Sequence, residues 1–248
     1  MLKPVGFSVI LLAVNLAVAD GDLLSRALEL AKDGPSAEAV AKLGELLRLE
    51  PENARAFYIR GRENFRLGRV KEAVADFDRY VKLVPDAEPR QWERGIAMYY
   101  AGEFARGARQ FELYQTFDDR DVENSVWRFL CMAREQGVEK ARAVMLPIKK
   151  DSRVPMMQVF ELYRGTIEPE QVLQAARAGE PAAEVLAARL FYAHLYLGLY
   201  HEATGDIAQA RKFIEHAADK KLQHAPRING YMWDVASVHW QRMLAEKK

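Results

Sequence analysis

The 248 residues suffice for one sizeable core or one stacked array of repeats, and 50% apolar and 29% charged residues exclude a chain that is disordered throughout. The 36 basic and 35 acidic residues leave a net charge of +1, which lacks the basic excess typical of nucleic-acid-binding proteins. The single cysteine, Cys131, cannot form an internal disulfide, so packing alone must hold the fold.

Residues 1–19 have the pattern of a secretory signal peptide. Lys3 gives the positive start, an apolar run follows from Val5 to Val14, and residues 17–19 read Ala-Val-Ala, a cleavage pattern. The alternative is a retained membrane anchor, but a spanning helix needs about 20 apolar residues and Asn15 interrupts this run. We therefore expect an exported protein without stable membrane insertion after cleavage: periplasmic in a bacterium, otherwise in the secretory pathway or extracellular.

A 34-residue period runs through the rest of the chain and predicts stacked pairs of helices. Small residues are needed where two helices approach closely, large apolar residues fill the space between repeats, and glycine suits the turn at the end of the first helix. Prolines end the second helix of a repeat. The pairs at this spacing are Pro51 and Pro85, Gly61 and Gly95, Gly68 and Gly102, and Tyr80 and Tyr114, beside two longer series, Ala39-Ala73-Gly107-Ala141 and Leu43-Phe77-Phe111-Met145.

The stretch from Phe57 to Pro85 resembles the tetratricopeptide repeat (TPR), which implies two antiparallel helices per repeat. Clear repeats are predicted at about 54–87, 88–121 and 191–224, and degenerate ones at about 20–53, 122–155 and 156–190. In the fourth repeat Arg153 stands in place of the terminal proline. We predict an all-α, right-handed TPR superhelix (α-solenoid) of five to six helical hairpins, with a capping helix at about 228–245. Residues 20–248 are expected to form one domain, and any break should lie near 149–155.

Residues 185 to 240 also resemble the C-terminal part of the bacterial envelope TPR proteins called NlpI. Leu197-Gly198, Tyr200, Gly205-Asp206 and Ala210 carry this resemblance, together with an aromatic-rich last helix. NlpI proteins are outer-membrane lipoproteins that act as adaptors for a periplasmic protease. This chain lacks the cysteine that would carry the lipid, so the resemblance does not extend to that anchor.

The TPR resemblance implies a concave binding face, lined by the first helix of each repeat. On the second repeat this face would carry Arg55, Tyr58, Arg62 and Arg66, which share one side of a helix. On the third and fourth it would carry Trp92, Tyr99, Tyr100 and Glu123, with Trp127 adjacent. Because arginine and aromatic residues anchor interfaces, we predict a groove for an extended peptide with acidic or C-terminal carboxylate groups.

A plainer interpretation is that these aromatic residues fill space between repeats and the arginines form a solvated face. The TPR subclass that clamps a terminal carboxylate uses Lys and Asn where Tyr58 and Arg62 stand, so that ligand is not predicted. The sequence thus favours a non-enzymatic adaptor or scaffold that binds a protein or peptide and needs no metal or cofactor.

Two other functions stay open. The first is a hydrolase or metal-dependent enzyme, which would need His, Asp and Glu side chains to converge in one pocket; His194 and His201 could share a helix face. The second is a self-assembling structural protein, for example a homodimer. Asp118, Asp119 and Asp121 are interpreted as helix caps, and Cys131 as a small core residue.

Overall fold

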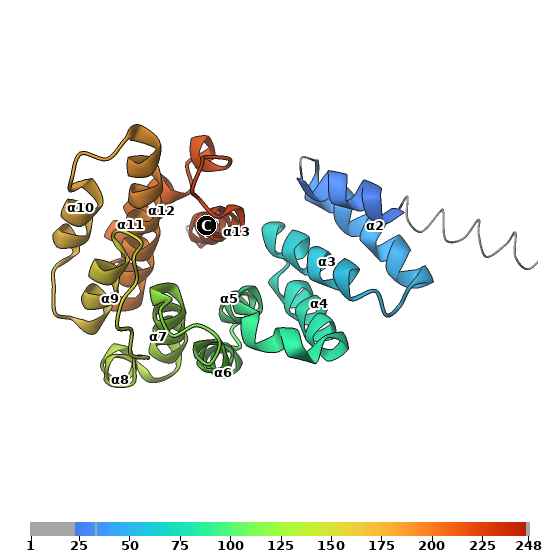
Figure 1. Cartoon of the computed structure of the whole chain (residues 1–248), viewed down its shortest axis with the longest axis horizontal. Coiled ribbons are helices and arrows are strands. Elements are labelled where there is room, and N and C mark those ends of the chain that lie inside the picture. The colour runs from blue at the N-terminus through green and yellow to red at the C-terminus, as the bar shows by residue number, and fades with distance from the viewer. Residues whose placement is uncertain (1–22, 33, 247–248) are drawn as a thin grey trace, which may run out of the picture. The chain divides into compact units, whose positions relative to one another are not determined.

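A computed structural model describes residues 23–32 and 34–246, and the predicted signal peptide lies outside them. The described residues form two compact units: unit 1 runs up to Pro85 and unit 2 begins at Asp86. All regular elements in these residues are helices, and they form six consecutive hairpins followed by one further helix (Figure 1). The prediction of an all-α helical-repeat fold with five to six hairpins and a last helix is confirmed.

Unit 1 contains the first two hairpins. Helical residues 23–32 pair with α2 (Ser36–Leu49), and α3 (Ala54–Arg66) pairs with α4 (Val70–Leu83). Asn53 caps α3 by accepting a hydrogen bond from the backbone N–H of Ala56 at 2.9 Å. The core between the hairpins is apolar, and its buried members are Ala27, Leu43, Leu46, Leu47 and Ala56.

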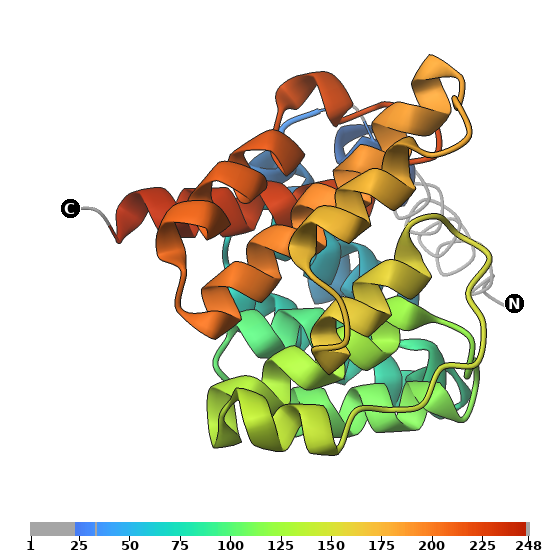
Figure 2. The same ribbon diagram turned by 90° about the vertical axis from the view of Figure 1, so that its left-hand side faces the viewer.

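Unit 2 begins with a 3-10 turn, η1 (Pro85–Arg90), and contains the other four hairpins. They are α5 (Trp92–Tyr100) with α6 (Phe104–Gln115), α7 (Val122–Gln136) with α8 (Val138–Ala143), α9 (Met156–Arg164) with α10 (Pro169–Arg177), and α11 (Ala183–Thr204) with α12 (Ile207–Ala217). A short turn, η2 (Lys220–Leu222), leads to α13 (Gly230–Ala245). Figure 2 shows α13, in red, crossing behind the orange helices α11 and α12.

In three of the hairpins a glycine on the first helix meets a bulky side chain on the second. A Cβ atom added at Gly95 would lie 2.7 Å from Cζ of Phe111, and one added at Gly198 would lie 2.6 Å from Cδ1 of Ile214. Gly61 and Phe77 repeat this arrangement at 3.0 Å. The small residue thus sets the distance between the two helices, as the 34-residue period predicts.

The fourth hairpin departs from this rule because Phe129 stands 34 residues after Gly95. Its ring packs edge-on against Tyr163 of α9, with 5.1 Å between the ring centroids. The second helix of this hairpin, α8, is only 6 residues long. Met145, the next member of the predicted series, lies beyond the end of α8, and residues 144–155 form a non-helical connection.

Replacing Gly95 by alanine should therefore lower the free energy of unfolding by about 1–3 kcal/mol, because the new methyl group overlaps the Phe111 ring. Gly44 in α2 is the matched control, since the nearest atom to an added Cβ there is 3.9 Å away. Gly44→Ala should leave stability unchanged or raise it by up to about 1 kcal/mol. Urea denaturation followed by circular dichroism measures both changes, and equal effects would contradict this account of the hairpins.

An arginine also recurs at the 34-residue period and ties neighbouring helices together. Its guanidinium reaches across a helix pair to a carboxylate or amide oxygen at 2.6–2.7 Å. The three pairs are Arg60 with Asp76, Arg94 with Gln110, and Arg128 with Glu112.

The last helix, α13, has a larger role in unit 2 than the predicted cap. It packs on the last hairpin, where Trp233 Nε1 donates to the carbonyl of Asp219 at 3.1 Å. It also reaches α5: the ring of Tyr231 lies edge-on to Trp92, with centroids 5.3 Å apart, and His239 Nδ1 lies 2.9 Å from the hydroxyl of Tyr100. Apolar residues on several sides of α13 make this possible, and the helix fills the inner face of unit 2.

Candidate functional site

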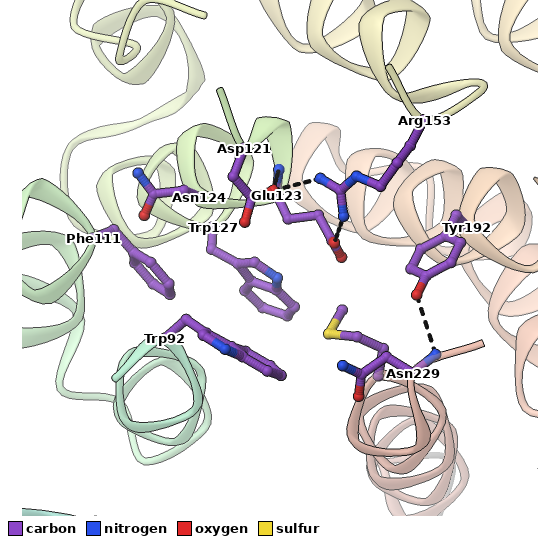
Figure 3. A pocket seen from close by; sticks show the side chains of 10 residues that line it. Trp92, Phe111, Asp121, Glu123, Asn124, Trp127, Arg153, Tyr192 and Asn229 are labelled. Atoms are coloured by element: carbon purple, nitrogen blue, oxygen red, sulfur yellow. Dashed lines mark hydrogen bonds and ion pairs between the residues drawn. The ribbon is translucent and has the colours of Figure 1, made fainter. Parts of the chain in front are cut away.

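A pocket of about 180 Å³ opens in unit 2 beside the start of α13 (Figure 3). The side chains around it come from α5, α6, α7, α11 and α13 and from the connection that follows α8. They are Trp92, Phe111, Asp121, Glu123, Asn124, Trp127, Arg153, Tyr192, Asn229 and Met232. Two aromatic rings, Trp92 and Trp127, form one wall, and Tyr192 faces them from the other side.

The acidic side of the pocket is built by the start of α7. Asp121 caps this helix, and its carboxylate accepts a hydrogen bond from the backbone N–H of Glu123 at 3.1 Å. The cap fixes Glu123 in the first turn, where the Tyr196 hydroxyl also donates to its carboxylate. The prediction that this aspartate cluster caps a helix is confirmed for Asp121.

Arg153 joins the acidic side from the connection after the short α8. Its guanidinium lies 2.5 Å from Asp121 Oδ1, 2.5 Å from Glu123 Oε2 and 2.6 Å from Asp151 Oδ2. One cation is therefore shared by three carboxylates, which leaves a surplus of two negative charges in the cluster.

The pKa directions in this cluster follow from burial and charge. Burial raises the pKa of Glu123, and Arg153 offsets only part of this effect. For Asp151, burial is outweighed by the hydrogen bonds from Arg153, so its pKa is lowered. Burial, followed by the charge of Glu123, raises the pKa of Tyr192 to about 12. Glu123 is thus a carboxylate for which burial outweighs the stabilisation by Arg153.

Two buried polar atoms of the pocket lack a hydrogen-bond partner among the described residues. They are the Nε1 donor of Trp127, a side chain that is 1% exposed, and the Oδ1 acceptor of Asn124, which is 2% exposed. The amide nitrogen of Asn124 is occupied, since it donates to Gln115 at 2.8 Å. Figure 3 shows the nitrogen-bearing edge of the Trp127 ring turned toward Glu123. An unmet donor and acceptor in a pocket are uncommon, because buried polar groups are nearly always paired.

The aromatic residues of the predicted groove fall into two groups in the structure, those that line the pocket and those that are buried. Trp92 and Trp127 both line the pocket. Tyr99 and Tyr100 are 4% and 5% exposed. Tyr100 packs against α13, with Arg242 lying 5.3 Å from its ring, and Tyr99 packs edge-on against Tyr100 and Trp127. Their position agrees with the plainer interpretation, that they fill space, because α13 occupies the face that the repeat pattern left open.

The four predicted residues of the second repeat lie on α3 in unit 1. Arg55 is exposed, whereas the ring of Tyr58 packs on Tyr80 of α4 with centroids 5.2 Å apart. The Arg62 guanidinium lies 5.9 Å from the Tyr58 ring, and Arg66 donates to the carbonyl of Ala31 at 3.1 Å. Tyr58 and Arg66 therefore have packing roles, and a ligand for this face stays a prediction.

The histidines of the enzyme alternative meet in a second pocket of unit 2, of about 360 Å³. His194, His201 and His216 line it, and the rings of His194 and His201 flank Phe213 at 5.9 and 5.5 Å. Burial, followed by the neighbouring His216, lowers the pKa of His194 to about 4. The rings of these histidines and of Phe213 pack against one another. In residues 23–32 and 34–246 no cluster of three or more His, Cys, Asp or Glu is arranged to hold a metal.

Cys131 is buried in α7, and burial raises the pKa of its thiol well above the usual value. Its sulfur explains the small residue at Gly107, where an added Cβ would lie 2.9 Å from Sγ. None of the helices in the described part of the chain is both long and apolar enough to cross a bilayer.

Sequence reasoning placed Glu123 on the groove but missed Arg153, Tyr192 and Asn229. The one sequence feature pointing to Arg153 is that it replaces the proline expected at the end of the fourth repeat. Tyr192 and Asn229 meet through a hydrogen bond from the Asn229 backbone to the Tyr192 hydroxyl at 3.2 Å. They reach the pocket because α13 folds back toward α5, which the period does not encode.

Comparison with known proteins supports the repeat architecture in the first part of the chain. Residues 24–88 match the family model described as tetratricopeptide repeat. The crystal structure of yeast Tom70 is similar with a TM-score of 0.38 and 17% identity, over 92% of this chain and 47% of that chain. The chain thus spans less than half the length of that protein. The resemblance of residues 185 to 240 to NlpI-type proteins stays a prediction. Residues 24–88 are therefore similar to the tetratricopeptide repeat, and helical hairpins continue after them in unit 2.

Proposed function

We propose that this protein is a non-enzymatic adaptor that binds a protein or peptide, with the pocket of unit 2 as its binding site. The tetratricopeptide-repeat match supports a protein-interaction role in general terms. The observation that carries the proposal is the pair of unpartnered buried atoms, Trp127 Nε1 and Asn124 Oδ1, at the pocket. A peptide offers both the carbonyl acceptor and the N–H donor that these atoms lack.

The size of the pocket fits one side chain of such a partner. A cavity of about 150 Å³ is large enough for benzene, and this pocket has about 180 Å³. Trp92 and Trp127 supply the aromatic contact area that anchors interfaces. The predicted signal peptide motivates the further proposal that binding takes place outside the cytoplasm.

The role as an adaptor is tested by selection from a random nine-residue peptide library displayed on phage. The full chain without residues 1–19 serves as bait, beside a Trp92→Ala variant whose helix content is checked. We expect the wild type to enrich a common sequence pattern and the variant to lose that enrichment. A wild type that enriches no pattern would contradict binding of linear peptides, and equal enrichment by both would place the site elsewhere.

A further inference from the structure

The walls of the unit 2 pocket combine aromatic faces with unbalanced negative charge. Trp92, Trp127 and Tyr192 contribute rings, and Asp121 and Glu123 contribute carboxylates. Aromatic faces attract cations, and they do so most strongly where water is excluded. Carboxylates beside such rings add a direct charge attraction.

The carboxylates of this cluster outnumber the cation that pairs with them. Arg153 pairs with Asp121, Glu123 and Asp151, and Lys150 and Arg120 line a neighbouring pocket with Asp121 and Asp151. The nearby Asp118 is itself matched by Arg120, at 3.4 Å. Glu123 belongs to this cluster, its side chain is 14% exposed, and burial raises its pKa.

The unpartnered Asn124 oxygen gives an independent reason to expect a ligand with N–H donors. Asn124 is 2% exposed, it lines the pocket, and its Oδ1 has no hydrogen-bond donor among the described residues. An ammonium or guanidinium group carries several donors and no acceptor, so it suits a carboxylate such as that of Glu123. The carbonyl of the adjoining peptide bond would then suit Trp127 Nε1.

From this arrangement, we propose that the pocket binds a basic side chain, lysine or arginine, of the partner peptide, between the rings of Trp92, Trp127 and Tyr192 and beside Glu123. This proposal rests on the proposed function and names the chemistry of the partner. Arg153 would then be a competitor within the site, because it shares Glu123 with the incoming cation.

The test uses three small probes that share a short alkyl chain and carry a positive, a negative or a neutral polar group: n-butylammonium, n-butyrate and n-butanol. The indole N–H signals of the four tryptophans in the 15N-labelled chain are followed by NMR during titration, after assignment with Trp→Phe variants. We expect butylammonium to shift the Trp92 and Trp127 signals saturably and to bind at least about tenfold more tightly than butanol. Butyrate should cause no shift. Equal binding of butanol and butylammonium would overturn the cationic specificity.

Two variants change the charge in opposite directions. Glu123→Gln should weaken butylammonium binding about fivefold to tenfold, whereas Arg153→Gln should strengthen it. Glu170→Gln is the matched control, since this exposed carboxylate lies at the other pocket. If Arg153→Gln fails to fold, the comparison of Glu123→Gln with Glu170→Gln decides, and equal affinities would refute the proposal.

A further variant, Asp121→Asn, can be used if Glu123→Gln fails to fold. Asp121→Asn keeps the oxygen that caps α7 but removes one charge, so it should also weaken binding. The proposed adaptor role and the proposed preference for basic side chains can be refuted separately. Peptides selected without lysine or arginine would leave the adaptor role standing and overturn the basic specificity, whereas a library without any enriched peptide would contradict the binding of linear peptides.

Discussion

Replacing Tyr231 by alanine is expected to lower the free energy of unfolding of unit 2 by about 3–5 kcal/mol, the range for deleting a large buried aromatic side chain. Tyr231 is 0% exposed, and it holds α13 against α5 through the edge-on contact with Trp92. Its hydroxyl lies 3.4 Å from the carbonyl oxygen of Glu93, a weak hydrogen bond. Chemical denaturation of the full chain, followed by near-ultraviolet circular dichroism, measures the change.

Two controls separate loss of docking from loss of any aromatic ring. Tyr231→Phe keeps the ring and should cost no more than about 1 kcal/mol. Trp240→Ala removes a larger ring from a half-buried position on the same helix and should cost clearly less than Tyr231→Ala. If Tyr231→Ala leaves stability unchanged, α13 is not an integral part of unit 2.

Acidification should destabilise unit 2 through His239. This residue is 2% exposed, and burial, followed by the charges of Arg242 and Arg134, lowers its pKa to about 3. A histidine with a lowered folded pKa binds its proton in the unfolded chain first, so stability falls as the pH drops below about 6.5. From pH 7 to pH 5 this amounts to about 2 kcal/mol.

Comparison with His239→Gln isolates this contribution. Glutamine can keep a hydrogen bond to the Tyr100 hydroxyl but does not titrate. Glu202, 3.4 Å from His239 Nε2, has a pKa raised by burial and acts in the opposite direction, but it is present in both proteins. The stability of His239→Gln should therefore fall less between pH 7 and pH 5. His224→Gln, at an exposed position, should behave as the wild type, and identical pH dependence in all three would refute the role of His239.

Much of the fold could be predicted because the 34-residue period records close contacts between helices. Gly68, Gly102 and Gly205 stand at turns with φ of 72°, 80° and 93°, a backbone conformation that favours glycine. The paired helices α9 and α10 lie within the degenerate repeat predicted at about 156–190. The recurring arginines follow the same period but were overlooked, since charged residues at helical spacing usually indicate a solvated face.

The parts that could not be predicted depend on contacts between residues far apart in sequence. The helix α8 has only 6 residues, and the connection after it carries Arg153 to Glu123 in the first turn of α7. The Tyr231 hydroxyl contacts the carbonyl of Glu93, 138 residues earlier in the sequence, and no local sequence pattern predicts that contact. Within unit 2, contacts from α13 cover Tyr100, whereas Trp92 and Trp127 line the smaller pocket.

The measurement that tests the account most directly is calorimetric titration of a peptide selected from the library against the wild type, Trp92→Ala and Trp240→Ala. Trp92 lines the pocket, whereas Trp240 lies on α13 and does not. We predict that Trp92→Ala weakens binding at least about tenfold, the effect of losing an aromatic anchor, and that Trp240→Ala binds as the wild type does. Equal affinities for the wild type and Trp92→Ala would contradict the claim that the unit 2 pocket is the binding site of this protein.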